Sequence, residues 1–118
     1  MTNSTISGNQ IFNENKTGIF ISDSYHNQII RNTISNSAAA IFLNVKASNN
    51  QIIRNTISNS QQGIALGVDA GSGNTIMNNK ITLNQPGQTD ITFQGSSDLS
   101  NNLIKQNKVI KHKLSSRD

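Results

Sequence analysis

The sequence predicts an all-β solenoid, in which short parallel strands repeat along the chain and stack coil upon coil. Three observations lead to this fold class. First, the stretch NQIIRNTISNS occurs at residues 27–37 and again at 50–60, a spacing of 50 − 27 = 23 residues, and a period of about 20–30 residues is typical of solenoids. Second, the apolar residues within GIFI (18–21), AIFL (40–43) and GIAL (63–66) alternate with variable ones, which is the period of a strand. Third, Gly, Asn and Ser interrupt the repeats too often for helices.

The two identical segments align the apolar residues into three columns, one for each strand of a coil. The first column contains Ile6, Ile29, Ile52, Ile76 and Ile104. The second contains Ile11, Ile34, Ile57, Ile81 and Val109. The third is made of pairs: Ile19 and Ile21, Ile41 and Leu43, Ile64 and Leu66, Ile91 and Phe93. Each column is expected to face inward, with a spacing of about 4.8 Å per coil. The single domain is therefore predicted to have about 4–5 coils of 22–28 residues, near 3–26, 27–49, 50–73, 74–101 and 102–112.

Asparagine is expected to have a structural role at the bends between strands. It tolerates left-handed backbone conformations, and stacked amides can hydrogen-bond from coil to coil. One set lies between the first two columns: Asn9, Asn32, Asn55, Asn79 and Asn107. A second set opens each repeat: Asn27, Asn50, Asn74 and Asn102. We predict two structural ladders, with a polar binding groove as the alternative.

The charge of the chain is small and unevenly distributed. The chain has 118 residues and a formal net charge of +4, and it is long enough for one domain at most. Half of its Lys and Arg residues lie near the C-terminus: Lys105, Lys108, Lys111, Lys113 and Arg117. We interpret 111–118 as a solubilising basic tail, with a patch for nucleic acid or acidic glycan as the alternative. No aromatic residue interleaves these cations, as in a platform that stacks bases, so no nucleic-acid partner is predicted.

The pattern N-x-I-x-x-N-x-I-x-N-S followed by G-I-x-L, found in residues 50–66, resembles the repeats of the pectin-lyase-like superfamily. The closest similarity is to the repeat class shared by carbohydrate-binding proteins and sugar hydrolases, periplasmic NosD-type proteins and mannuronan C5-epimerases. The resemblance covers about residues 3–110. It implies a right-handed, single-stranded parallel β-helix, glycan binding along an outer strand face, and a secreted, periplasmic or cell-surface location. Its members range from lyases and epimerases to adhesins without catalysis, so it indicates the fold more specifically than the activity.

Asp23, Tyr25 and His26 are the candidate catalytic residues, in ISDSYHNQ at the first long turn. A carboxylate, a phenol and an imidazole could abstract and return a proton α to a uronate carboxyl. The resemblance supports this choice, because epimerases of this fold use Asp, His and Tyr together. However, the equivalent turns of the next two coils supply only Lys46 and Asp69. A turn capped by Asp23, with a packed Tyr25 and an exposed His26, is the alternative.

Phe20 and Phe42 are candidate substrate-binding residues. They occupy the outward position between the core residues of the third column, where the next two coils carry Ala65 and Thr92. Neighbouring Phe side chains on an exposed strand face would stack against sugar rings or against a neighbouring protomer. Packing beneath a loop is the alternative.

Arg31 and Arg54 are further candidate substrate-binding residues, in register with Gly8, Asn78 and Gln106. Two guanidinium groups about one coil apart would clamp the carboxylates of sugar units. The resemblance adds that lyases of this superfamily use Arg or Lys as the base, often next to calcium.

No cofactor and no metal site are predicted. Five of the six acidic residues are scattered across different registers, at Glu14, Asp23, Asp69, Asp90 and Asp98, whereas calcium needs about six or more oxygen ligands. The segment DAGSGN (69–74) is similar to a glycine-rich calcium turn, but it occurs once, so calcium has no further support. The chain also has no cysteine and no apolar run near the roughly 18–20 residues of a membrane span.

The fourth coil contains an insertion. Its step of 28 residues from Ile76 to Ile104 places the extra residues around NQPGQTD (84–90), which holds Pro86, the chain's single proline. Insertions in solenoids form loops on one face, often the binding face. This loop is the first place to look for a ligand, with a tolerated insertion as the alternative.

The leading hypothesis is a non-catalytic repeat module that binds polysaccharide or a neighbouring protomer on its outer strand face. Two alternatives remain: a uronate-polysaccharide epimerase or lyase, and a purely structural spacer. The open ends of a solenoid expose apolar columns and strand edges. We therefore also expect self-association through the coil ends, or a chain that is the C-terminal part of a longer protein.

Overall fold

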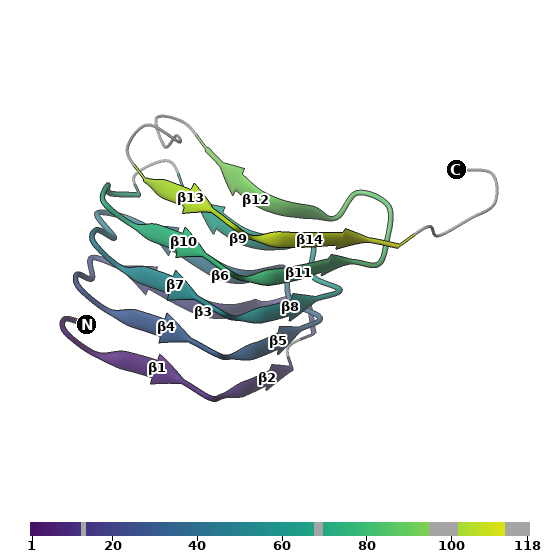
Figure 1. Cartoon of the computed structure of the whole chain (residues 1–118), viewed down its shortest axis with the longest axis horizontal. Coiled ribbons are helices and arrows are strands. Elements are labelled where there is room, and N and C mark those ends of the chain that lie inside the picture. The colour runs from purple at the N-terminus through teal and green to yellow at the C-terminus, as the bar shows by residue number, and fades with distance from the viewer. Residues whose placement is uncertain (13, 68–69, 95–101, 113–118) are drawn as a thin grey trace.

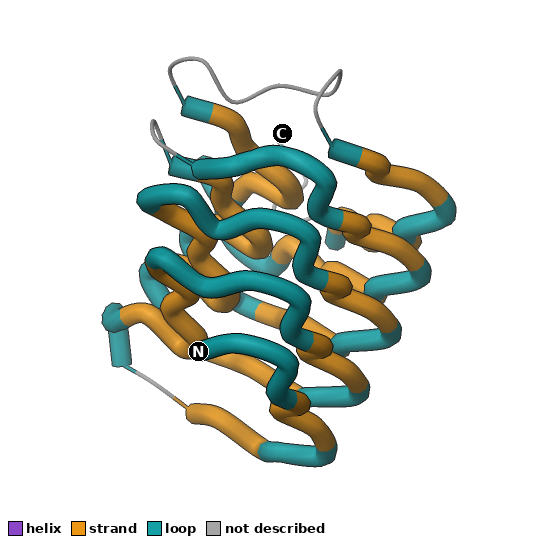
Figure 2. Tube along the Cα trace, turned by 90° about the vertical axis from the view of Figure 1, so that its left-hand side faces the viewer, coloured by secondary structure: helices purple, strands orange, loops and turns teal. Residues whose placement is uncertain are grey.

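The structure is a computed structural model that describes residues 1–12, 14–67, 70–94 and 102–112. Within these ranges every regular element is a β-strand. Each of the first four coils contributes one strand to each of three parallel sheets, and the fifth coil contributes a strand to the first and second sheets (Figure 1). Figure 2 shows the coils from the side, stacked on one another and joined by turns at the corners. The described part of the chain contains no helix that is long and apolar enough to cross a membrane.

The strands of each sheet follow one another in coil order. The first sheet consists of β1 (Thr5–Ser7), β4 (Gln28–Ile30), β7 (Gln51–Ile53), β10 (Thr75–Met77) and β13 (Leu103–Lys105). The second consists of β2 (Gln10–Phe12), β5 (Thr33–Ser35), β8 (Thr56–Ser58), β11 (Lys80–Leu83) and β14 (Lys108–Lys111). The third consists of β3 (Thr17–Ser22), β6 (Ala39–Asn44), β9 (Gln62–Leu66) and β12 (Thr89–Phe93).

The strand registers confirm the three predicted columns. In the first sheet Ile29 pairs with Ile52, and Ile52 pairs with Ile76. In the second sheet Ile34 pairs with Ile57, and the paired core positions of the third sheet align in the same way. These side chains are almost entirely buried in the central coils. Burying one such side chain contributes roughly 1.5–3 kcal/mol, so the stacked columns are the main source of stability.

Both asparagine ladders are present, and their members in the second to fourth coils are almost fully buried. Asn55 represents the pattern: its Oδ1 accepts hydrogen bonds from the backbone N (2.9 Å) and Nδ2 (3.1 Å) of Asn32 in the preceding coil. Its own Nδ2 donates to the carbonyl oxygen of Ile29 (2.9 Å) and to Oδ1 of Asn79 (3.0 Å). Each amide thus satisfies polar groups of both neighbouring coils, which makes its burial favourable.

The residue that bends the backbone is not the ladder asparagine but the residue before it. Positive φ angles of 57–68° occur immediately before the first ladder, at Gly8, Arg31, Arg54, Asn78 and Gln106. Positive φ angles of 56–77° also occur immediately before the second ladder, at His26, Asn49 and Gly73. The expectation that the ladder asparagines need left-handed conformations is therefore wrong. They are selected for the amide, whose hydrogen bonds require a side chain inside the bend, while the preceding residue makes the turn.

The insertion lies where the sequence placed it. Residues 84–88 separate β11 from β12, whereas only residues 59–61 separate β8 from β9 in the preceding coil. The loop is held by Gln88, whose Oε1 accepts hydrogen bonds from the backbone N of Asn84 (2.7 Å) and Gln85 (3.2 Å). At the C-terminal end, the backbone N of His112 still bonds to the carbonyl oxygen of Leu83. The rest of the predicted basic tail, residues 113–118, lies outside the described residues.

Candidate functional site

Phe20 and Phe42 form an aromatic pair on the outer face of the third sheet. They are aligned partners in β3 and β6, with ring centroids 5.4 Å apart and planes inclined by 40°. Phe20 is 55% exposed, while Phe42 is half-buried. Tilted aromatic pairs at this separation hold each other in place, so the two rings present one preformed apolar surface.

The exposed column does not continue past these two rings. Ala65 follows Phe42 in register but has no exposed surface, which corrects the expectation of an open outward column. The Phe42 ring leans toward the third coil, since its Cε1 atom lies 3.1 Å from where a Cβ on Gly67 would be. Thr92, in the fourth coil, is half-buried. The aromatic surface is therefore confined to the first two coils.

The Asp23–Tyr25 pair lies in the turn between the third and first sheets. The Tyr25 hydroxyl donates a hydrogen bond of 2.8 Å to Oδ1 of Asp23. This bond, together with partial desolvation and the carboxylate charge, raises the pKa of Tyr25 above 10.0. A raised pKa disfavours the phenolate, so the environment of Tyr25 opposes a role as a base.

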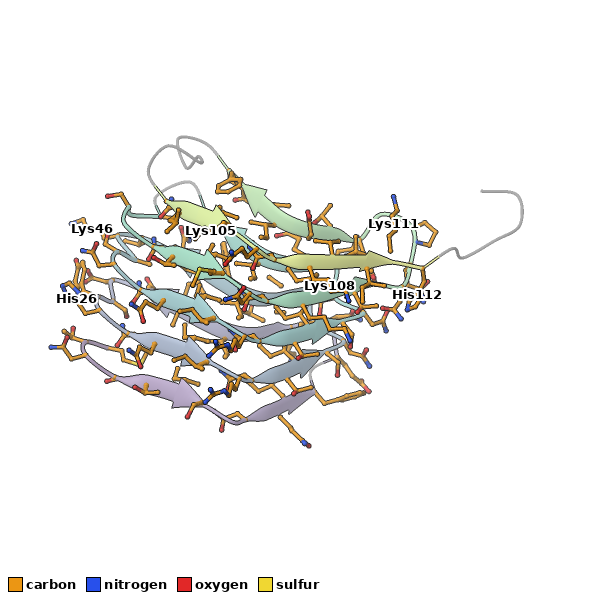
Figure 3. The ribbon with its side chains drawn as sticks, in the orientation of Figure 1. His26, Lys46, Lys105, Lys108, Lys111 and His112 are labelled. Atoms are coloured by element: carbon orange, nitrogen blue, oxygen red, sulfur yellow. The ribbon has the colours of Figure 1, made fainter. Side chains whose placement is uncertain are left out.

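His26 does not join the Asp23–Tyr25 pair. Its backbone has a φ angle of 57°, and the described contacts give its side chain no hydrogen bond to Asp23 or Tyr25. Figure 3 shows His26 and Lys46 at the same edge of the coils, in the turns that close the third sheet onto the first. Of the two candidates in the equivalent turns, Lys46 is exposed, and Asp69 lies outside the described residues.

The Tyr25 pKa can be tested directly because Tyr25 is the only tyrosine and the chain has no tryptophan. We expect the ultraviolet absorbance of tyrosinate to appear with a midpoint above pH 10.0 and to shift downward in Asp23→Asn. The stability contributed by this pair is complete below pH 10.0 and is lost as the pH rises through the raised pKa. An identical midpoint in both proteins would show that the hydrogen bond does not form in solution.

Arg31 and Arg54 lie in the turn between the first and second sheets, in register as predicted. Both side chains are exposed, and their φ angles are 58° and 57°. The backbone N atoms donate to the carbonyl oxygens of Ile53 and Met77 in the following coil. This bonding holds each arginine in a left-handed conformation that only Gly and Asn adopt readily.

Replacing Arg31 or Arg54 with asparagine, the residue at the equivalent position 78, is expected to stabilise the protein. Asn is less strained in this conformation, so the free energy of unfolding should rise by roughly 0.5–1 kcal/mol for each change. Urea denaturation of the single and double variants measures the effect. A fall in the free energy of unfolding, instead of this rise, would mean that the arginine side chains support the fold through contacts.

A polar groove of about 490 Å³ lies at the edge of the third sheet, beneath the inserted loop. Glu14 lines one part of it and Pro86 another, and six side-chain amides supply most of the rest: Asn15, Asn36, Asn59, Gln61, Gln85 and Gln88. The amides are connected, since Nε2 of Gln88 donates to Oδ1 of Asn59 (3.0 Å) and Nδ2 of Asn59 donates to Oδ1 of Asn36 (2.8 Å). This size is typical of ligand pockets, and amides can both donate to and accept from hydroxyl groups.

The inserted loop was the sequence feature that predicted a ligand site here. The residues that line the groove on the side facing the loop, Asn36 and Asn59, were not predicted. Asn36 and Asn59 occupy the same place in the duplicated segment, which marked them as aligned residues but not as partners of Gln88. No group of three or more His, Cys, Asp or Glu in the described ranges is arranged to hold a metal ion. The segment 69–74, which is similar to a calcium turn, lies partly outside those ranges, and Asp98 lies entirely outside them.

A family model described as the right-handed β-helix region matches residues 2–116 of the chain. The comparisons with curated proteins and with solved structures found no match.

Proposed function

Because the chain belongs to the right-handed β-helix family, we propose that it is a non-catalytic repeat module that binds polysaccharide on the outer face of its third sheet. The observation that carries this proposal is the Phe20–Phe42 pair, with centroids 5.4 Å apart and Phe20 more than half exposed. Flat apolar rings complement the C–H faces of sugars, and a pair fixed in advance loses little entropy on binding. Such a module acts where polysaccharide occurs, on the cell surface, in the periplasm or after secretion.

The position of the amide groove also supports the outer face of the third sheet as the binding surface. Its residues Ser37, Gln61 and Gln88 lie within two residues of the starts of β6, β9 and β12. Phe42 lies three residues into β6, about 10 Å along the strand. A sugar chain that crosses the third sheet parallel to its strands would therefore meet the amides first and the aromatic rings next. Apart from Glu14, the residues that line the groove are neutral, and neutral amides together with apolar rings suit uncharged sugar units.

The turn that holds Asp23, Tyr25 and His26 supports a module without catalysis. A uronate epimerase or lyase needs a base that can lose its proton near neutral pH. The hydrogen bond to Asp23 raises the pKa of Tyr25 instead, and the side chain of His26 forms no described hydrogen bond with either residue. Arg31 and Arg54 lie at the next corner, between the first and second sheets, and a strand of the first sheet separates them from this turn.

The double variant Phe20→Ala with Phe42→Ala tests the proposal. We expect retention on an immobilised neutral glucan to fall about tenfold, which corresponds to roughly 1.4 kcal/mol. Phe12→Ala is the matched control, because Phe12 is 69% exposed on β2 of the second sheet. Unchanged retention in the double variant, or an equal loss in Phe12→Ala, would contradict the proposal.

A further inference from the structure

Five exposed cations gather along the corner between the first and second sheets. We call this surface the basic corner, and it consists of Arg31, Arg54, Lys80, Lys105 and Lys108. Arg31 and Arg54 occupy the turn itself in the second and third coils. In the fourth coil Lys80 begins β11, directly after the ladder, and in the fifth Lys105 and Lys108 flank the turn. Each coil from the second to the fifth thus supplies at least one cation.

The strand registers turn these residues into one continuous row. Lys80 pairs with Lys108 across β11 and β14, and Lys105 follows Met77 in the first sheet. Successive coils are about 4.8 Å apart, so the cations recur at that spacing along the solenoid axis. Figure 3 shows Lys105 and Lys108 on the side of the solenoid formed by the first and second sheets.

No described carboxylate lies near this row. Among the acidic residues in the described ranges, Glu14 and Asp23 lie in the turns on either side of β3, and Asp90 lies in β12. All three therefore border or belong to the third sheet. The described strands of the first and second sheets, and the turns between them, contain cations but no anions. Like charges arranged in this way raise the local concentration of a polyanion.

The two arginines occupy turn positions whose backbone conformation does not itself require arginine. Both have positive φ angles, in a register where the uncharged residues Gly8, Asn78 and Gln106 adopt the same conformation. Strained positions are found preferentially at functional sites. A guanidinium group forms paired hydrogen bonds with planar anions such as carboxylates, and an uncharged turn residue would lose this property.

The shape of the row selects among polyanions. Its cations lie in three registers along one corner, and no aromatic residue occupies these registers. Binding of single-stranded nucleic acid usually depends on aromatic side chains that stack with the bases. An acidic polysaccharide needs only a row of cations, because it presents its charges on one narrow chain.

We propose that the basic corner binds an acidic polysaccharide, with Arg31 and Arg54 holding its anionic groups and the three lysines extending the row. This site is distinct from the aromatic pair and the amide groove, which face the other side of the solenoid. The protein therefore has one surface for uncharged sugar faces and a second for charged sugar chains.

The test compares the affinity of the full chain and its variants for polygalacturonate at several salt concentrations. Arg31→Asn with Arg54→Asn removes two charges and should leave the fold intact, because Asn78 already occupies this register. We expect at least a tenfold loss of affinity and a shallower dependence on salt. Lys16→Gln with Lys46→Asn is the control with the same change in charge, and it should alter the affinity by less than about twofold.

Several outcomes would overturn this inference. Equal losses in the two double variants would mean that net charge, rather than the basic corner, controls binding. Tighter, arginine-dependent binding of oligothymidylate would identify the partner as nucleic acid. Dextran sulfate in place of polygalacturonate distinguishes sulfates from carboxylates, and binding to neither would exclude the proposed ligand class. The variant Phe20→Ala with Phe42→Ala should keep its affinity for polygalacturonate, and a loss there would mean that the two surfaces are one site.

Discussion

The variant Asn55→Ala is expected to lose about 3–5 kcal/mol of unfolding free energy, at roughly 1–3 kcal/mol for each buried polar group left without a partner. Asn55 is only 1% exposed, and its amide makes four hydrogen bonds to Asn32, Ile29 and Asn79. Alanine removes all four and leaves polar groups of two neighbouring coils buried without their partners. Chemical denaturation followed by circular dichroism measures the loss.

Asn9→Ala is the matched control for this ladder variant. Asn9 occupies the same register in the first coil but is exposed, and its side chain only donates, to Ser7 and to Asn32. Water can replace these bonds, so the expected loss is about 0.5–1 kcal/mol. Equal losses at the two positions would contradict a ladder whose energy depends on burial.

The variant Ile52→Ala is expected to lose about 3–4 kcal/mol, the usual range for a large aliphatic side chain removed from a packed core. Ile52 has no exposed surface and lies between Ile29 and Ile76 in the first column. The cavity cannot be filled by a shift of its neighbours, because both are fixed by the strand ladder. The midpoint of urea denaturation measures this change.

Ile53→Ala supplies the control within the same strand. Ile53 has the same side chain but points outward and is half-buried, so a loss of about 1 kcal/mol is expected. The contrast between these adjacent residues tests the register, since a shift of one residue would exchange the inward and outward faces. A larger loss at Ile53 than at Ile52 would contradict the described coil.

The three columns were predictable because a solenoid repeats one local environment. Ile29 and Ile52 occur in identical segments, and identical segments can stack only in register. The ladders were predictable for the same reason, as the placement of Asn32 and Asn55 shows. The residues with left-handed backbone conformations were not predictable, because asparagine suits both a left-handed turn and an amide ladder. Hydrogen-bond geometry distinguishes the two roles: Asn55 is in the ladder, and Arg54 makes the turn.

The site was less predictable because it depends on how coils of different length meet. The pairing of Phe20 with Phe42 follows from the register alone. The burial of Ala65 does not, since it depends on the direction in which the Phe42 ring leans. Likewise, the groove requires Gln88 of the inserted loop to reach Asn59 of the preceding coil. An inserted loop has no equivalent in the repeat from which its path could be inferred.

The most direct test of the central claim is retention of the chain on a panel of neutral and acidic polysaccharides, with analysis of the same samples for new unsaturated or epimerised sugar units. We expect retention without either product, because the Asp23–Tyr25 pair disfavours a phenolate base and the aromatic pair supplies only a binding surface. Formation of a product that is lost in His26→Ala with Tyr25→Phe would contradict this account and identify the turn as a catalytic site.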